Sequence, residues 1–185
     1  MNVGISLGWN CEAAIRAVEL GLRKLKKDGY KTCPFDECIT NYEGIVLCLN
    51  DNFKYFCDPQ YLKIINAPFS TGGIIKGEPL LYNTYYNFIF NHESPGHANL
   101  YITQAWPGGK THYIDNNYKF FIERYQKRIC NFRQYLETAE ITFIIVTYED
   151  AINDISEKYK VIKLLPNVKK ELYEGHMNLM KYAKN

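Results

Sequence analysis

Val3-Gly-Ile-Ser-Leu-Gly-Trp-Asn-Cys-Glu-Ala-Ala-Ile15 joins a short apolar run to residues that favour a helix. Gly8 follows the apolar run, and a glycine at such a point lets the chain turn with dihedrals that a β-branched residue would resist. Asn10 is a favourable N-cap residue, because its side-chain oxygen can accept a hydrogen bond from a free amide of the first helical turn. The stretch therefore predicts a buried strand, a tight turn and a helix that begins at Cys11.

Cys11 would occupy the first position of this helix. There the unpaired amides and the positive end of the helix dipole stabilise a thiolate, which lowers the pKa of a cysteine below its usual value. The same amides can bind a developing oxyanion. The alternative is a small packing residue, because free cysteines are among the most buried residue types. The sequence of the corner leaves both interpretations open.

The composition is that of one globular domain. Of the 185 residues, 46% are hydrophobic and 23% are charged, so the chain can bury a substantial core. We therefore predict a single domain over residues 1–185. The net charge is only +2, and the lysines are interleaved with acids, so we expect no nucleic-acid partner.

Two further features concern the cellular setting. The N-terminus lacks the pattern of a secretory signal, and no window approaches the roughly 18 apolar residues of a membrane span. We therefore expect an intracellular, cytoplasmic protein without a membrane partner. In that reducing setting the six cysteines are expected to be free thiols.

The rest of the chain predicts further helices and strands. Besides the first helix, which would reach Leu20 or Leu25, apolar periodicity predicts helices near 41–49, after Asp115 as far as Leu136, over 151–158 and over 168–183. Aromatic and β-branched runs predict one or two short strands over 53–65, one over 80–90, a short one over 101–106, and two more over 141–147 and 161–165. Gly21 followed by Leu22 is typical of a helix C-terminal cap.

The last two strands and the helix between them decide the predicted fold class. Short links around an amphipathic helix favour a βαβ unit, whose strands are parallel. We therefore predict an α/β fold in which a central sheet, parallel at least in its C-terminal half, is flanked by helices.

Five segments of the chain combine into a recognisable pattern. They are Ser6-Leu-Gly-Trp-Asn-Cys11, Gly21-Leu-Arg23, Pro34-Phe-Asp36, Phe90-Asn-His-Glu93 and residues 124–132. Together they resemble a family of uncharacterised proteins from bacteria and large DNA viruses that is described as papain-like cysteine peptidases. The N-terminal pattern of that family is a Ser-Leu-Gly-x-x-Cys corner, a helix, a Leu-Arg pair and a Pro-Phe-Asp loop. The resemblance spans most of residues 3–150, and its label implies a papain-like α+β fold as the alternative architecture.

The resemblance implies a cysteine-dependent hydrolase or acyl transferase with a Cys-His dyad. Cys11 would be the nucleophile and His92 its base, with the imidazole taking or sharing the thiol proton. A third group would orient the ring, and Asp36 and Glu93 are equally plausible for that role. The substrate would be a peptide or a small acyl compound.

The oxyanion site departs from that of well-studied papain-like enzymes. Those carry a glutamine shortly before the nucleophile, whereas no glutamine precedes Cys11. Asn10, Ser6 or backbone amides would have to replace it. Arg124 and Arg128 lie four residues apart on the long predicted helix, so they could hold a carboxylate or phosphate of a substrate. The alternative for both arginines is a charged outer face.

The remaining histidines and the paired cysteines give weaker signals. His97 and His112 lie in glycine-containing loops and are interpreted as solvated, although either could instead be the base. His176 is interpreted as a partly buried packing residue. Cys33 and Cys38 are not followed by a second pair at comparable spacing, so we predict no metal and no cofactor.

The main alternative function is a catalytically inactive structural or interaction protein, such as a virion or assembly component. The missing glutamine supports it, and so do the 16 tyrosines, because exposed tyrosines favour interfaces. A homodimer, and packaging in the virion if the protein is viral, are expected on this hypothesis.

Overall fold

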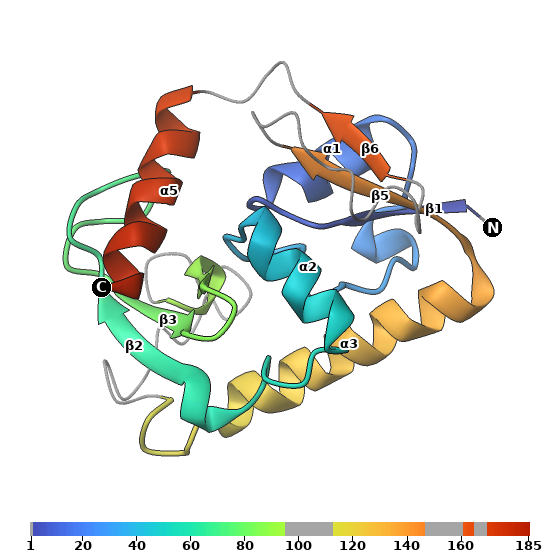
Figure 1. Cartoon of the computed structure of the whole chain (residues 1–185). Helices are drawn as coiled ribbons and strands as arrows, with labels where there is room; N and C mark the ends of the chain where they lie inside the picture. The colour runs from blue at the N-terminus through green and yellow to red at the C-terminus, as the bar shows by residue number, and fades with distance from the viewer. Residues whose placement is uncertain (1, 95–112, 147–160, 165–169) are drawn as a thin grey trace.

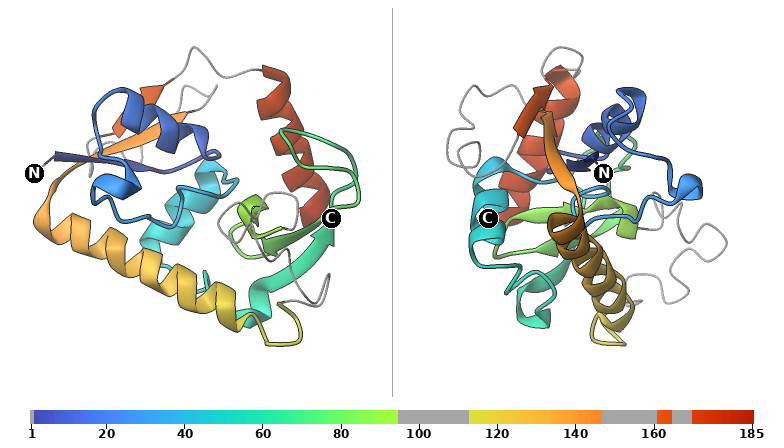
Figure 2. Two further views of the ribbon diagram at one scale, coloured as in Figure 1. Left: turned by 180° about the vertical axis from the view of Figure 1, so that it is seen from behind. Right: turned by 90° about the vertical axis from the view of Figure 1, so that its right-hand side faces the viewer.

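Two small sheets and four α-helices make up the part of the chain that the structure, a computed structural model, describes. These are residues 2–94, 113–146, 161–164 and 170–185 (Figure 1). Figures 1 and 2 show a parallel sheet with helix α1 on one side of the molecule and an antiparallel sheet with helix α5 on the other. Helix α3 runs along the base of both halves.

The parallel sheet has the strand order β1-β5-β6. Its strands are β1 (Asn2–Ser6), β5 (Glu140–Val146) and β6 (Val161–Leu164), and both pairings are parallel. The predicted parallel pair near the C-terminus is therefore confirmed, and the opening strand β1 joins the same sheet on the other side of β5. The helix predicted over 151–158 and the strand predicted over 101–106 lie outside the described residues.

Helix α1 (Glu12–Glu19) packs against β1 and β5 and ends at Leu20, the earlier of the two predicted ends. Gly21 has a φ of +67°, in the left-handed region that favours glycine. The backbone N–H of Gly21 donates to Val18 O, and that of Leu22 donates to Ala17 O, each at 2.9 Å. These two bonds are the pattern of a Schellman cap, so the Gly21-Leu22 signal is confirmed.

The antiparallel sheet corrects one expectation. Its strands are β2 (Leu62–Asn66), β3 (Pro79–Asn83) and β4 (Phe88–Phe90), in the order β2-β3-β4. The prediction of a single strand over 80–90 was wrong, because this stretch is a hairpin. The side-chain oxygen of Asn83 accepts from the amides of Tyr85 and Tyr86, and Asn87 has a φ of +57°. Both features reverse the chain.

The remaining helices agree with the sequence. They are α2 (Tyr42–Asn50), α3 (Lys119–Thr138) and α5 (Lys170–Lys184). The apolar face of α3 contributes Phe121, Tyr125 and Phe132 to the main core, where their rings meet Phe35 and Phe90. None of the helices in the described part of the chain is both long and apolar enough to span a membrane.

Candidate active site

A pocket of about 350 Å³ brings together segments that are far apart in the sequence. Its walls come from the start of α1, the short turn η3 (Asn91–Glu93) that follows β4, the loop at Gly72, and α5. Cys11 and His92 both line it. The parallel half of the molecule therefore supplies the candidate nucleophile, and the antiparallel half supplies the candidate base.

The chain between β1 and α1 positions Cys11 through close contacts that require glycine. Gly8 has a φ of +103°, and a Cβ added there would lie 1.7 Å from Thr40 Oγ1. Thr40 Oγ1 in turn donates to Leu7 O at 3.0 Å. Trp9 is buried against Tyr173, at 5.3 Å between ring centroids, so the corner is packed against α5. Cys11 follows this closely packed segment and is only half-buried.

Asn10 accepts from a free amide of the first helical turn as predicted, but it is not the N-cap residue, because α1 begins one residue later than expected. The backbone N–H of Glu12 donates to Asn10 Oδ1 at 2.8 Å. The helix starts at Glu12, and Cys11 is its N-cap residue. Asn10 is 5% exposed and lines the pocket, so its side-chain NH2 is the group that it can offer to a ligand.

The structure reverses the expected pKa shift of Cys11. Burial raises the pKa of the thiol above its ordinary value, and the charges of Glu37 and Glu12 raise it further. A hydrogen bond with the Cys11 backbone lowers the pKa but does not compensate. The expectation of a preformed thiolate was therefore wrong, because desolvation outweighs the helix terminus. The Cys11 thiol is therefore protonated near neutral pH.

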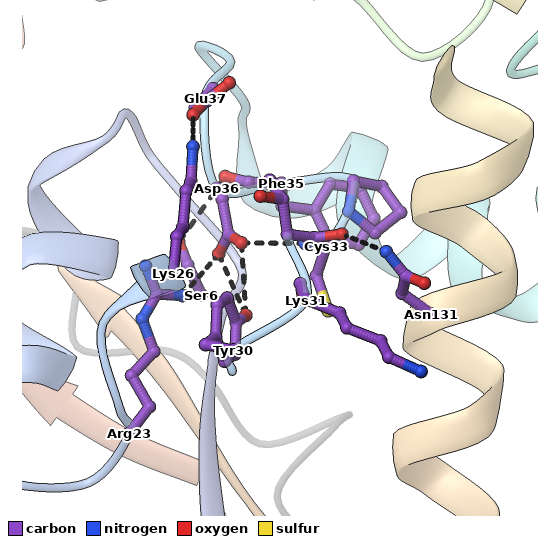
Figure 3. A network of polar contacts seen from close by, with 12 residues as sticks. Ser6, Arg23, Lys26, Tyr30, Lys31, Cys33, Phe35, Asp36, Glu37 and Asn131 are labelled. Atoms are coloured by element: carbon purple, nitrogen blue, oxygen red, sulfur yellow. Dashed lines mark hydrogen bonds and ion pairs between the residues drawn. The ribbon is translucent and has the colours of Figure 1, made fainter. Parts of the chain in front are cut away.

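The two acids predicted to orient the base lie in buried networks. Asp36 accepts from Arg23 at 2.7 Å, from the Tyr30 hydroxyl and from the backbone N–H of Cys33 (Figure 3). Glu93 accepts from the Arg124 guanidinium and the Tyr113 hydroxyl, while burial raises its pKa. Neither acid is among the described residues that line the pocket. Their contacts favour a role in stabilising the fold.

Glu37 is a candidate that the sequence analysis missed. Its carboxylate accepts from Arg128 at 2.7 Å and from Lys26 at 2.5 Å; Figure 3 shows the second contact. Burial raises the pKa of Glu37, but Arg128, Lys26 and His92 together bring it below its ordinary value. Glu37 thus interacts electrostatically with both Cys11 and His92. The only signal in the sequence was an acid directly after the Pro-Phe-Asp loop.

The other predicted binding residues do not line the pocket. Ser6 is fully buried, where its hydroxyl donates to Phe35 O and accepts from the Gly8 backbone N–H at 3.1 Å. It therefore supports the turn before Cys11. Arg124 and Arg128 do bind carboxylates, but these are the protein's own Glu93 and Glu37.

The other histidines and cysteines were considered from the sequence as bases or metal ligands, and among them His176 lies at the pocket. His176 is buried and lines the pocket, with its ring centroid 5.0 Å from that of Trp9. His97 and His112 lie outside the described residues. All six cysteines are free thiols, as expected. The described ranges contain no group of three or more His, Cys, Asp or Glu side chains that could hold a metal ion.

Comparison with known proteins places the whole site within one family model. The model described as "Putative papain-like cysteine peptidase (DUF1796)" matches residues 2–182. No curated protein and no solved structure matches the chain.

Proposed function

The chain belongs to this family of putative papain-like cysteine peptidases, and from that premise we propose that it is a cysteine-dependent hydrolase or acyl transferase. Cys11 is the nucleophile and His92 the general base. The observation that carries the proposal is the pocket that both residues line. Covalent catalysis requires a nucleophile and a base that reach the same bound group, and two such residues in the wall of one pocket support the proposal.

The raised pKa of Cys11 determines how the reaction begins. Because the resting thiol is neutral, its proton passes to the His92 imidazole as Cys11 Sγ attacks the carbonyl carbon of the substrate. The carbonyl π electrons move onto oxygen, where the Asn10 side-chain NH2 donates a hydrogen bond. When the carbonyl re-forms, the leaving group departs with the proton from His92, and a thioester remains on Cys11. Water or another acceptor then releases the acyl group by the reverse sequence.

Glu37 supports this cycle from outside the pocket. Its negative charge favours the imidazolium form of His92 and disfavours the thiolate form of Cys11. The carboxylate is held in place by Arg128 and Lys26. We therefore assign Glu37, rather than Asp36 or Glu93, as the acid that stabilises the protonated base.

The pocket walls suit a peptide or a small acyl substrate. Ile15 and Leu172 supply apolar surface, while Glu12, Arg16 and Glu19 form an ion-paired edge on α1. Cys11 is half-buried and open to this pocket. An accessible thiol supports the catalytic proposal over the alternative of an inactive structural protein.

An acylation experiment tests the proposal. With p-nitrophenyl acetate as the acyl donor, we expect acetyl transfer to Cys11 in preference to the other five cysteines, measured by peptide mass spectrometry. Cys11→Ser should abolish this transfer, and His92→Ala should slow it by about 10²–10⁴-fold, the usual contribution of a general base. Cys130→Ser is the matched control, because Cys130 is an exposed thiol that does not line the pocket. Equal acetylation of all six cysteines, or a rate insensitive to His92→Ala, would contradict the proposal.

A further inference from the structure

Ile15 is a large apolar residue in the wall of the pocket, and 53% of its surface is exposed. It lies one helical turn after the candidate nucleophile. Cys11 has helical dihedrals, with a φ of −66° and a ψ of −12°, and the Ile15 backbone N–H donates to Cys11 O at 3.1 Å. Residues four apart on a helix are neighbours on its surface, with about 5–6 Å between their Cβ atoms. The Ile15 side chain therefore lies beside that of Cys11.

Leu172 supplies apolar surface to the same pocket from α5. It packs against the small core around Trp9, which fixes its position relative to the corner. The loop at Gly72 lies directly against it, because a Cβ added at Gly72 would be 2.4 Å from Leu172 Cδ1. A side chain at residue 72 would therefore displace Leu172. The glycine keeps the leucine in the pocket wall, so both α1 and α5 present an aliphatic side chain to the pocket.

The charged residues of the wall are paired with one another. The Arg16 guanidinium lies 3.7 Å from the Glu12 carboxylate and 2.7 Å from that of Glu19. Ile15 and Leu172 themselves carry no side-chain group that can form a hydrogen bond. A polar group of a ligand that contacted both of them would lose its water without gaining a partner, which is unfavourable. The part of a ligand that contacts both residues should therefore be apolar.

We propose that Ile15 and Leu172 form a subsite for an aliphatic acyl chain, and that the substrate of Cys11 carries such a chain. This inference rests on the proposed function. In the acyl-enzyme the carbonyl carbon is bonded to Cys11 Sγ, so the first carbons of the chain lie next to Cys11 and hence next to Ile15. A volume of about 350 Å³ is at the small end for ligand sites and suits a short chain. A small acyl compound or a peptide with an aliphatic side chain can supply it.

Transfer of acyl groups of different length to Cys11 tests this subsite. The rates with p-nitrophenyl butyrate and p-nitrophenyl acetate are each divided by the rate of the same ester with N-acetylcysteine, which corrects for the reactivity of the ester. In the wild type we expect the corrected butyrate rate to be about tenfold the acetate rate, because burial of one methylene is worth about fourfold. In Ile15→Ala and in Leu172→Ala this preference should fall by at least about threefold.

The matched control is Leu20→Ala. Leu20 is an apolar residue at the C-terminal end of α1 and is 54% exposed, as Ile15 is, but it does not line the pocket. The preference for butyrate should stay at the wild-type value in this variant.

A second pair of esters distinguishes the two sources of the chain. The p-nitrophenyl esters of N-acetylleucine and N-acetylglycine differ in the aliphatic side chain of an amino acid. A corrected preference for the leucine ester that exceeds the preference for butyrate would identify a peptide, and the reverse order would identify a small acyl compound. In both cases the larger preference should fall in Ile15→Ala.

Two results would overturn the inference and leave the proposed function standing. One is a wild-type protein that does not prefer the longer group in either pair of esters. The other is a preference that Ile15→Ala does not change, even if both rates fall together, because Ile15 would then only support the shape of the corner. Failure of all four esters to acylate Cys11 would instead contradict the proposed function itself. Thermal unfolding shows which variants are folded, and the exposed position of Ile15 lets Ile15→Ala decide the test if Leu172→Ala does not fold.

Discussion

The network around Asp36 and the pocket around Cys11 differ in how completely their polar groups bond to the protein. Both oxygens of Asp36 accept hydrogen bonds, and their donors are the Arg23 guanidinium, the Tyr30 hydroxyl and the Cys33 backbone N–H. In the pocket, by contrast, Asn91 Oδ1 makes no hydrogen bond to a described residue and Cys11 is half-exposed. A saturated buried network stabilises one conformation, whereas groups with spare bonding capacity are available to a ligand.

The largest expected effect comes from breaking the saturated network with Asp36→Ala. This change leaves the Arg23 guanidinium, whose side chain is 7% exposed, buried without its carboxylate. We expect the free energy of unfolding in urea to fall by about 3–5 kcal/mol, the usual cost of removing one partner of a buried ion pair.

The matched control for this change is Glu19→Ala. The Arg16–Glu19 pair has the same separation of 2.7 Å, but its side chains are 33% and 53% exposed. Removing it should cost about 0–1 kcal/mol, because water screens a surface pair. If Asp36→Ala cost no more than Glu19→Ala, the contrast between a stabilising network and an open pocket would be wrong.

A smaller effect is expected from Glu37→Gln, because Glu37 follows Asp36 in the chain and interacts electrostatically with Cys11 of the pocket. Loss of its negative charge should lower the pKa of Cys11, so alkylation by iodoacetamide at a fixed pH near 8 becomes faster, by up to about tenfold per pKa unit. Acetyl transfer should become slower, because the imidazolium of His92 loses a stabilising charge. Rates of both reactions measured against pH check the prediction. A change of both rates in the same direction would contradict the assigned role of Glu37.

The smallest effect should come from Glu12→Gln, which sharpens the interpretation of Glu37. Glu12 also raises the pKa of Cys11, but it is partly exposed and raises it less than Glu37 does. The midpoint of Cys11 alkylation should therefore move to lower pH, by less than about one unit, with no slowing of acetyl transfer. A slower acetyl transfer would show that the charge of Glu12, and not only that of Glu37, stabilises the protonated base.

Local signals predicted much of the fold. The Gly21-Leu22 cap, helix α3 and the parallel pair β5–β6 each follow from patterns within a few residues or from one short connection. The hairpin over 79–90 was missed because its aromatic residues continue through the turn. The reversal depends on the Asn83 side chain, which caps backbone amides that periodicity does not reveal.

Some residues of the candidate site were likewise singled out from the sequence, and others were missed. Resemblance singled out Cys11 and His92, and the pocket holds both. Glu37 was missed because what distinguishes it is its burial and its ion-pair partners. Those are properties of the folded molecule.

The sequence by itself determined the glycine corner, the helix that follows Cys11, the parallel strands and the family. Only the tertiary structure decided which acid interacts electrostatically with His92, and that burial raises the pKa of the Cys11 thiol. The reason is that short-range signals depend on backbone dihedrals and periodicity along the chain. Desolvation and charge interactions depend instead on distances through space. These distances are set by the pairing of β1 with β5 and by the packing of α5 against Trp9.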